Sequence, residues 1–182
     1  MDLTSRYLGF TLSSPLMPGA SPLADDLDTV RRLEDAGAAA IVMCSLFEEQ
    51  IVAAQERAVR EIDVPEESYR EALTYLARTE DMQLGPELYL GKLAQVKESV
   101  SIPVIGSLNG VSEGGWTEYA KLIEEAGADA LELNMYFLAA DPAESAAEVE
   151  DRLLEVVRAV KGEVAIPVAV KLSPFFTALP HF

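Results

Sequence analysis

Apolar and polar positions follow two patterns that take turns along this chain. Short apolar runs suit buried strands, and longer stretches between them repeat their apolar residues at helical spacing. In one such stretch Trp116, Tyr119, Ile123 and Ala126 fall on a single helical face. Short apolar strands that alternate with amphipathic helices are typical of a parallel sheet.

Two internal echoes organise the sequence into repeated β/α units. Residues 33–42 are echoed by residues 123–132, since each segment has an acidic helix end, then a glycine and an apolar run. The glycine is typical of the residue that follows a helix. Residues 101–106 are echoed by residues 165–170, and in both a proline stands where a strand is expected to begin.

These patterns predict the order of elements along the chain. We expect a short hairpin at the N-terminus, followed by strands and helices in alternation. The hairpin covers 3–12; the strands cover 16–19, 39–45, 104–108, 130–136 and 168–172; the helices cover 25–36, 66–79, 86–99 and 143–161, with another around 116–126.

A series of β/α/β crossovers forms either an open doubly wound sheet or a closed barrel. No Gly-x-Gly-x-x-Gly motif follows any of the expected strands, which removes the main signal of a dinucleotide-binding open sheet. A whole barrel takes about 250 residues, whereas this chain has 182. The sequence therefore predicts an α/β fold of the (β/α)8 TIM barrel class, incomplete, with about five strands present.

Composition narrows the partners and the compartment. The net charge of −17 argues against nucleic acid and anionic membranes, because both repel an acidic chain. The single cysteine, Cys44, excludes an intrachain disulfide and a multi-cysteine metal site, and it indicates a reducing compartment. Residues 1–10 lack a signal-peptide pattern, and no apolar run is long enough to span a bilayer. We expect a cytoplasmic protein with a small-molecule substrate and no metal.

Polar residues at the C-terminal ends of the expected strands are the candidates for a site, because barrel active sites lie there. The period of two along a strand puts Glu132 and Asn134 on one face, and the same count turns Lys171 inward on the next strand. A lysine inside a sheet needs an anionic partner. An ion pair with Glu132 and an anionic ligand are both open at this point.

Several of these motifs, taken in order, resemble the class 1 dihydroorotate dehydrogenase family, and the match is closest to its bacterial dihydroorotate dehydrogenase-like branch. They are Ser-Pro-Leu-Met at 14–17, Ala-Ser at 20–21, Ser-Leu-Phe-Glu-Glu at 45–49, Glu-Leu-Asn at 132–134 and Val-Ala-Val-Lys-Leu-Ser-Pro at 168–174. The resemblance covers essentially the whole chain. It implies an FMN-dependent oxidoreductase that acts on a CH–CH bond and is linked to pyrimidine biosynthesis. It also makes residues 1–182 the N-terminal portion of a single FMN-binding domain.

The resemblance also assigns residues. It implies that Ala20, Ser21, Asn134 and Lys171 contact the flavin, and Lys171 and Asn134 are the predicted catalytic residues. The charge of Lys171 would stabilise the anionic reduced flavin. Two further strand-end residues complete the predicted cofactor site: Ser45 and Asn109.

Three positions depart from the family pattern. Phe137 stands where the family loop carries a Cys or Ser base, Ala139 replaces a substrate-holding Asn, and Met43 replaces a Lys. Tyr136 is the nearby group with a titratable proton, and an ordinary phenol is a poor base at neutral pH. These departures predict slow oxidation of dihydroorotate.

Two alternatives to an active flavin enzyme remain at this stage. The family binds the FMN phosphate after strands 7 and 8, so a chain with five strands could be a catalytically inactive truncated fragment with no complete cofactor site. Its open strand edge would then favour a homo-oligomer or a complementing C-terminal half. The other alternative is a Schiff-base aldolase that uses Lys171.

Overall fold

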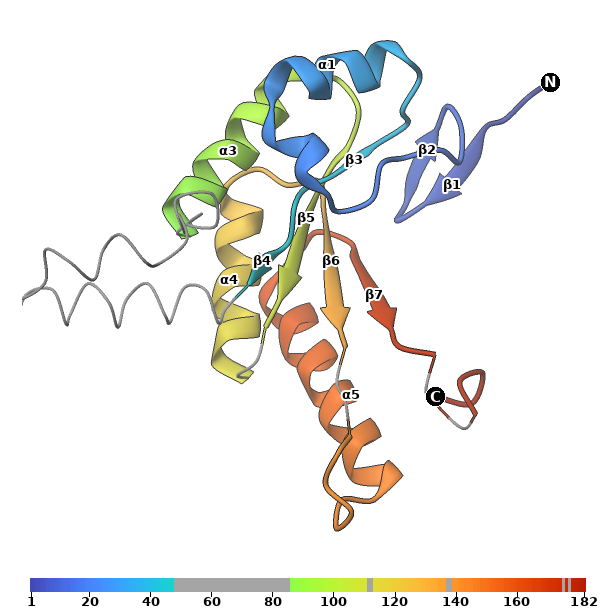
Figure 1. Ribbon diagram of the computed structural model, residues 1–182, viewed down its shortest axis with the longest axis vertical. Helices are drawn as coiled ribbons and strands as arrows, with labels where there is room; N and C mark the ends of the chain where they lie inside the picture. Colours follow the sequence, from blue (N-terminus) through green and yellow to red (C-terminus); the bar gives the residue numbers. More distant parts are fainter. Residues whose placement is uncertain (48–85, 111–112, 137–138, 175, 177) are drawn as a thin grey trace, which may run out of the picture.

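The centre of the structure, a computed structural model, is a parallel sheet. Residues 1–47, 86–110, 113–136, 139–174, 176 and 178–182 are described. Five strands form the sheet: β3 (Ile41–Val42), β4 (Leu46–Phe47), β5 (Val104–Asn109), β6 (Ala130–Met135) and β7 (Val168–Leu172). Their order is β3-β5-β6-β7, and β4 pairs with β5 beyond the end of β3. Figure 1 shows the curled sheet with the chain's helices beside it.

The main core lies between one face of this sheet and the helices. The helices are α1 (Leu27–Asp35), α3 (Pro86–Ser99), α4 (Glu113–Glu125) and α5 (Ala146–Glu163). Leu131 and Leu133 of β6 are fully buried in the cluster that holds Val96, Ile123 and Val160 from three of the helices. Burying one such side chain stabilises the fold by about 1.5–3 kcal/mol. Within the described residues, no helix is both long and apolar enough to cross a bilayer.

The opposite, concave face begins with an apolar layer. Ala40, Val42, Ile105 and Ala130 lie near the starts of their strands and form a second buried cluster. An antiparallel hairpin of β1 (Ser5–Tyr7) and β2 (Phe10–Leu12) lies beside this end of the sheet (Figure 1). Its Leu8 and Phe10 side chains pack against the apolar layer. Only the later halves of the strands are left to carry polar groups on this face.

Two glutamates explain one of the echoes seen in the sequence. Near the end of α1, Glu34 accepts hydrogen bonds from the backbone N–H and the hydroxyl of Ser101, at 2.8 and 2.6 Å. At the corresponding place in α4, Glu124 accepts from the backbone N–H groups of Ala165 and Ile166, at 2.8 and 3.1 Å. The Glu34 carboxylate thus caps the turn before β5, and the Glu124 carboxylate caps the turn before β7. The two halves of the chain repeat the same capping interaction.

The predicted fold class needs correction. The sequence predicts an incomplete (β/α)8 TIM barrel, whereas the described strands form an open, curled half-barrel sheet. The predicted first strand is also missing from the sheet. The segment 16–19 is not a strand, and one backbone hydrogen bond, from Ala39 N to Leu16 O at 2.9 Å, links it to the start of the sheet. Within the expected strand 39–45 only β3 is a strand, and the short strand β4 follows after it, because the pairing with β5 is interrupted between Val42 and Leu46.

Other elements agree with the expected pattern. The hairpin, the helix 86–99 and the strand 168–172 are confirmed. Gly37 and Gly127 follow α1 and α4 with φ near 95° each, a conformation that favours glycine, as the echo predicted. The helix expected over 66–79 lies outside the described residues.

The contact between β5 and α4 can be tested with Gly106→Ala. A Cβ atom at this position would lie 2.3 Å from Cγ2 of Ile123, a β-branched side chain that cannot easily turn away. We expect a loss of about 1–3 kcal/mol in the free energy of unfolding, measured by urea denaturation. Gly91→Ala in α3, where a Cβ would meet nothing within 4 Å, is the control and should be neutral or stabilising. Equal effects at both positions would contradict the packing described here.

The cap that Glu34 provides should make stability depend on pH. Its hydrogen bonds from Ser101 lower the pKa of the Glu34 carboxyl in the folded state. A lowered pKa stabilises the fold above the ordinary carboxyl pKa, and this contribution disappears as the pH falls through the folded value. Because its hydrogen bonds with Ser101 are exposed to solvent, we expect Glu34→Gln to cost only about 0.5–1 kcal/mol at pH 7. The difference from the wild type should shrink as the pH is lowered below the ordinary carboxyl pKa, measured by urea denaturation at several pH values, and Glu118→Gln at an exposed position of α4 is the control for loss of one carboxylate.

Candidate functional site

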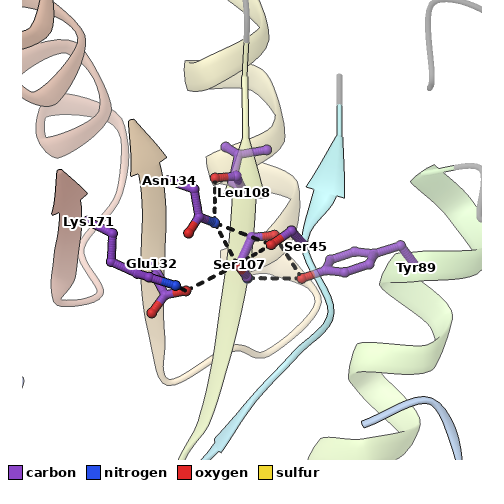
Figure 2. A network of polar contacts seen from close by, with 7 residues as sticks. All are labelled: Ser45, Tyr89, Ser107, Leu108, Glu132, Asn134 and Lys171. Carbon is purple, nitrogen blue, oxygen red and sulfur yellow. Dashed lines mark hydrogen bonds and ion pairs between the residues drawn. The ribbon is translucent and has the colours of Figure 1, made fainter. Parts of the chain in front are cut away.

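Five polar side chains meet on the concave face, toward the C-terminal ends of the strands. They come from the β3–β4 connection and from β5, β6 and β7, and Figure 2 shows them with their hydrogen bonds. We call them the polar cluster: Ser45, Ser107, Glu132, Asn134 and Lys171. The alternation of side chains along β6 explains why two of them lie on this face: Leu131 and Leu133 face the helices, while Glu132 and Asn134 face the concave side.

Asn134 holds the cluster together through its amide nitrogen. Nδ2 donates to Oγ of Ser107 at 2.9 Å, to Oγ of Ser45 at 3.3 Å and to the carbonyl oxygen of Leu108 at 3.3 Å. The Leu108 carbonyl can only accept a hydrogen bond, so it fixes which end of the amide faces β5. The carbonyl oxygen of Asn134 is therefore turned away from β5, and no donor from the described residues reaches it.

Lys171 and Glu132 form the charged part of the cluster. Nζ of Lys171 lies 3.0 Å from Oε1 of Glu132, and the same oxygen accepts a longer bond of 3.4 Å from Ser107 Oγ. The carboxylate side chain is 11% exposed and the lysine 42%. Partial burial acts to lower the pKa of Lys171, but the hydrogen bond and charge of Glu132, with a contribution from Tyr136, raise it overall. Lys171 is thus a cation at neutral pH, and the ion pair that the sequence left open is formed.

Tyr89 supports the cluster from the helix side of the sheet. Its phenol accepts a hydrogen bond from the backbone N–H of Ser107 at 3.0 Å and donates one to the Ser107 carbonyl at 3.2 Å. In an unbroken ladder these two groups would pair with the strand beside β5. Here β3 ends after Met43 N bonds Ile105 O, and pairing resumes only between Leu46 and Leu108. The phenol therefore bridges a gap in the sheet.

The state of the Tyr89 phenol suits this role. Burial raises the pKa of Tyr89 far above that of an ordinary phenol, so it keeps the proton that it donates. Sequence reasoning missed this residue. The one available signal was a hydroxyl on the same buried helix face as Leu93 and Val96, and it does not reveal which strand the hydroxyl reaches.

The structure brings some predicted site residues together and not others. Ser45, Asn134 and Lys171 converge in the polar cluster, as the strand phase predicted. Ala20 packs against the apolar layer of the same concave face. Ser21 precedes a 3-10 turn, η1 (Pro22–Asp25), and its side chain does not cap that turn.

Asn109 ends β5 outside the polar cluster. It lines a cavity of about 340 Å³ that it shares with Asn134, Phe47 and Trp116, and one wall of this cavity is the side of α5. The cavity thus continues from the cluster toward the helix layer.

The positions where the family pattern is broken have different surroundings. Met43 is 1% exposed and lies in the core between the sheet and the helices, so its side chain is directed away from the concave face. Ala139 is exposed. Phe137 lies outside the described residues.

Comparison with known proteins identifies relatives of one kind. A protein of Aeropyrum pernix named as a dihydroorotate dehydrogenase A (fumarate) is 43% identical over 90 aligned positions, which cover 44% of this chain and 27% of that protein. The catalytic subunit of dihydroorotate dehydrogenase B (NAD(+)) of Thermoplasma volcanium is 27% identical over 185 aligned positions, or 95% of this chain and 54% of that protein. The chain thus spans about half the length, or less, of these relatives. No family model matches the chain.

Similarity to a solved structure supports the fold but not a function. A Burkholderia cenocepacia protein described as a phosphonomutase superimposes with a TM-score of 0.50 at 18% identity, over 92% of this chain and 57% of that one. At this identity the similarity carries no information on activity.

The role of Tyr89 can be tested with Tyr89→Phe. The change keeps the ring but leaves the buried N–H and carbonyl of Ser107 without their partner. An unsatisfied buried group costs about 1–3 kcal/mol, so we expect a loss of at least that size in urea denaturation. Tyr7→Phe in the exposed strand β1 is the control, with no expected loss. A Tyr89→Phe protein as stable as this control would mean that the phenol does not support β5.

Proposed function

Because the chain is a relative of the dihydroorotate dehydrogenases, we propose that it forms part of a single FMN-binding domain of an oxidoreductase that acts on a CH–CH bond of a small molecule. The polar cluster is the observation that carries this proposal. Lys171 lies opposite Asn134 in the pairing of β7 with β6, so a cationic donor and an amide stand side by side on the concave face. Both come from motifs that resemble the family.

The cluster suits the pyrimidine end of a flavin ring. That edge of the ring alternates hydrogen-bond acceptors with an N–H donor. The Lys171 ammonium, 42% exposed, can donate to an acceptor, and the carbonyl oxygen of Asn134 can accept from the N–H. Ala20 belongs to the apolar layer of the same face and would contact the flat face of the ring. Ser21, Ser45 and Asn109 complete the proposed cofactor site.

The bound flavin would supply the acceptor for a hydride from the substrate. The residues of the chain would do the rest. Asn134 would orient the ring, because Ser45, Ser107 and the Leu108 carbonyl hold its own amide in place. Lys171 would stabilise negative charge at the ring edge, where a fixed cation in a partly buried site acts more strongly than in water.

We infer that dihydroorotate is a poor substrate. The family loop carries a Cys or Ser at the position of Phe137, and a phenyl ring cannot accept a proton. A positioned base contributes about 10²- to 10⁴-fold to a rate. The preferred substrate would be one whose oxidation does not depend on a base at this position.

Titration of FMN into the purified chain, followed by flavin fluorescence, tests the cofactor site. Lys171→Met and Asn134→Ala should each weaken binding by about 10-fold or more, since a hydrogen bond to a charged group is worth about 1.5–3 kcal/mol. Lys121→Met on the exposed side of α4 is the control for loss of one positive charge and should bind like the wild type.

The outcomes separate the two parts of the proposal. Equal affinity in all four proteins would contradict the cofactor assignment. Absence of saturable FMN binding would favour the alternative of a fragment with no complete cofactor site. Rapid formation of orotate from dihydroorotate by the FMN-loaded protein would contradict only the inference drawn from Phe137.

A further inference from the structure

Glu132 is a buried carboxylate for which neither the fold nor the flavin contacts above give a role. It is 8% exposed, and its hydrogen bonds go to Lys171 and Ser107. A buried carboxylate is costly unless it is paired, so its presence next to Lys171 calls for a functional explanation.

The pairing of β6 with β7 fixes what surrounds Lys171. Its partner in the register is Asn134, and Glu132 lies two residues earlier on the same face of β6. Tyr136, two residues after Asn134, is the titratable group on the other side. The ammonium of Lys171 and the carboxylate of Glu132 are in contact at 3.0 Å, and their formal charges are opposite. The other members of the polar cluster are two hydroxyls and an amide.

We propose that Glu132 is a positioning residue that fixes the Lys171 ammonium and balances its charge, so that the site tunes the reduction potential of the flavin. This inference rests on the proposed flavin site. An unpaired Lys171 would favour the anionic reduced ring over the neutral oxidised ring and so raise the potential. With Glu132 in contact, that preference is weakened. The ammonium still donates a hydrogen bond to either form of the ring.

Glu132→Gln is the direct test, because glutamine keeps the shape and an acceptor oxygen but removes the charge. In the flavin-free protein, Lys171 should lose its proton at lower pH than in the wild type, with an acid dissociation constant raised about 10-fold or more. Titration of isotope-labelled lysine side chains by NMR, with Lys171 assigned from the spectrum of Lys171→Met, measures this. Glu155→Gln on the exposed face of α5 is the matched control and should leave the Lys171 titration unchanged.

The reduction potential of bound FMN, measured against a dye of known potential, is the second readout. We expect Glu132→Gln to raise it by about 30 mV, which is a 10-fold change for a two-electron couple, and Lys171→Met to lower it. The double variant Glu132→Gln with Lys171→Met removes both formal charges of the pair. Its potential should return toward the wild-type value, whereas purely structural damage would add up in the double variant.

The two readouts keep the inference separate from the flavin proposal. An unchanged Lys171 titration in folded Glu132→Gln would overturn the inference whether or not FMN binds. A shifted titration without any FMN binding would support the pairing and favour the fragment with no complete cofactor site. If Glu132→Gln does not fold, the double variant and Lys171→Met decide: a double variant whose potential is no higher than that of Lys171→Met would overturn the proposal.

Discussion

The alternation of side chains across β5 and β6 is the constraint on which the rest of this structure depends. Each strand is paired on both sides, so every side chain must enter either the helix-side core or the concave face. Leu108, Leu131 and Leu133 go to the core, which holds the sheet against its helices. The same alternation leaves Ser107, Glu132 and Asn134 on the opposite face. Core and site are therefore two consequences of one strand geometry, and a shift of register would destroy both.

The concave face is itself divided along the strands. Near the strand starts it is apolar and covered by the N-terminal hairpin, and toward the strand ends it is polar. The interruption between β3 and β4 falls at this boundary, where Ser45 joins the cluster and the Tyr89 phenol takes over the backbone groups of Ser107. An irregular stretch of strand thus supplies one side chain of the cluster. Tyr89 of α3 supplies the hydrogen bonds that the missing strand pairing would have given to the backbone of Ser107.

Charge in the cluster is held as a pair. The protein carries a net charge of −17, yet the cluster presents a cation, because Lys171 is bound to a carboxylate that is almost buried. Such pairing lets an acidic protein hold a positively charged donor at a fixed place.

Local sequence determined a large part of this protein. The echoed helix-glycine-strand segments predicted α1, α4 and their left-handed glycines, and the period of two in Glu-Leu-Asn and Val-Ala-Val-Lys-Leu predicted that Glu132, Asn134 and Lys171 share a face. These features depend on residues close together in the chain, where backbone geometry and side-chain spacing act directly. The predicted first strand at 16–19, the unbroken strand at 39–45 and the barrel as a fold class were wrong. Strand formation there depends on a partner far away in sequence, which no local pattern specifies.

The tertiary structure alone decided that Glu34 and Glu124 cap distant turns, that Met43 faces the core and that Tyr89 reaches Ser107. Each of these depends on how separate elements pack, and the hydrogen-bond partners of Tyr89, Glu34 and Glu124 lie 18 to 67 residues away in the sequence.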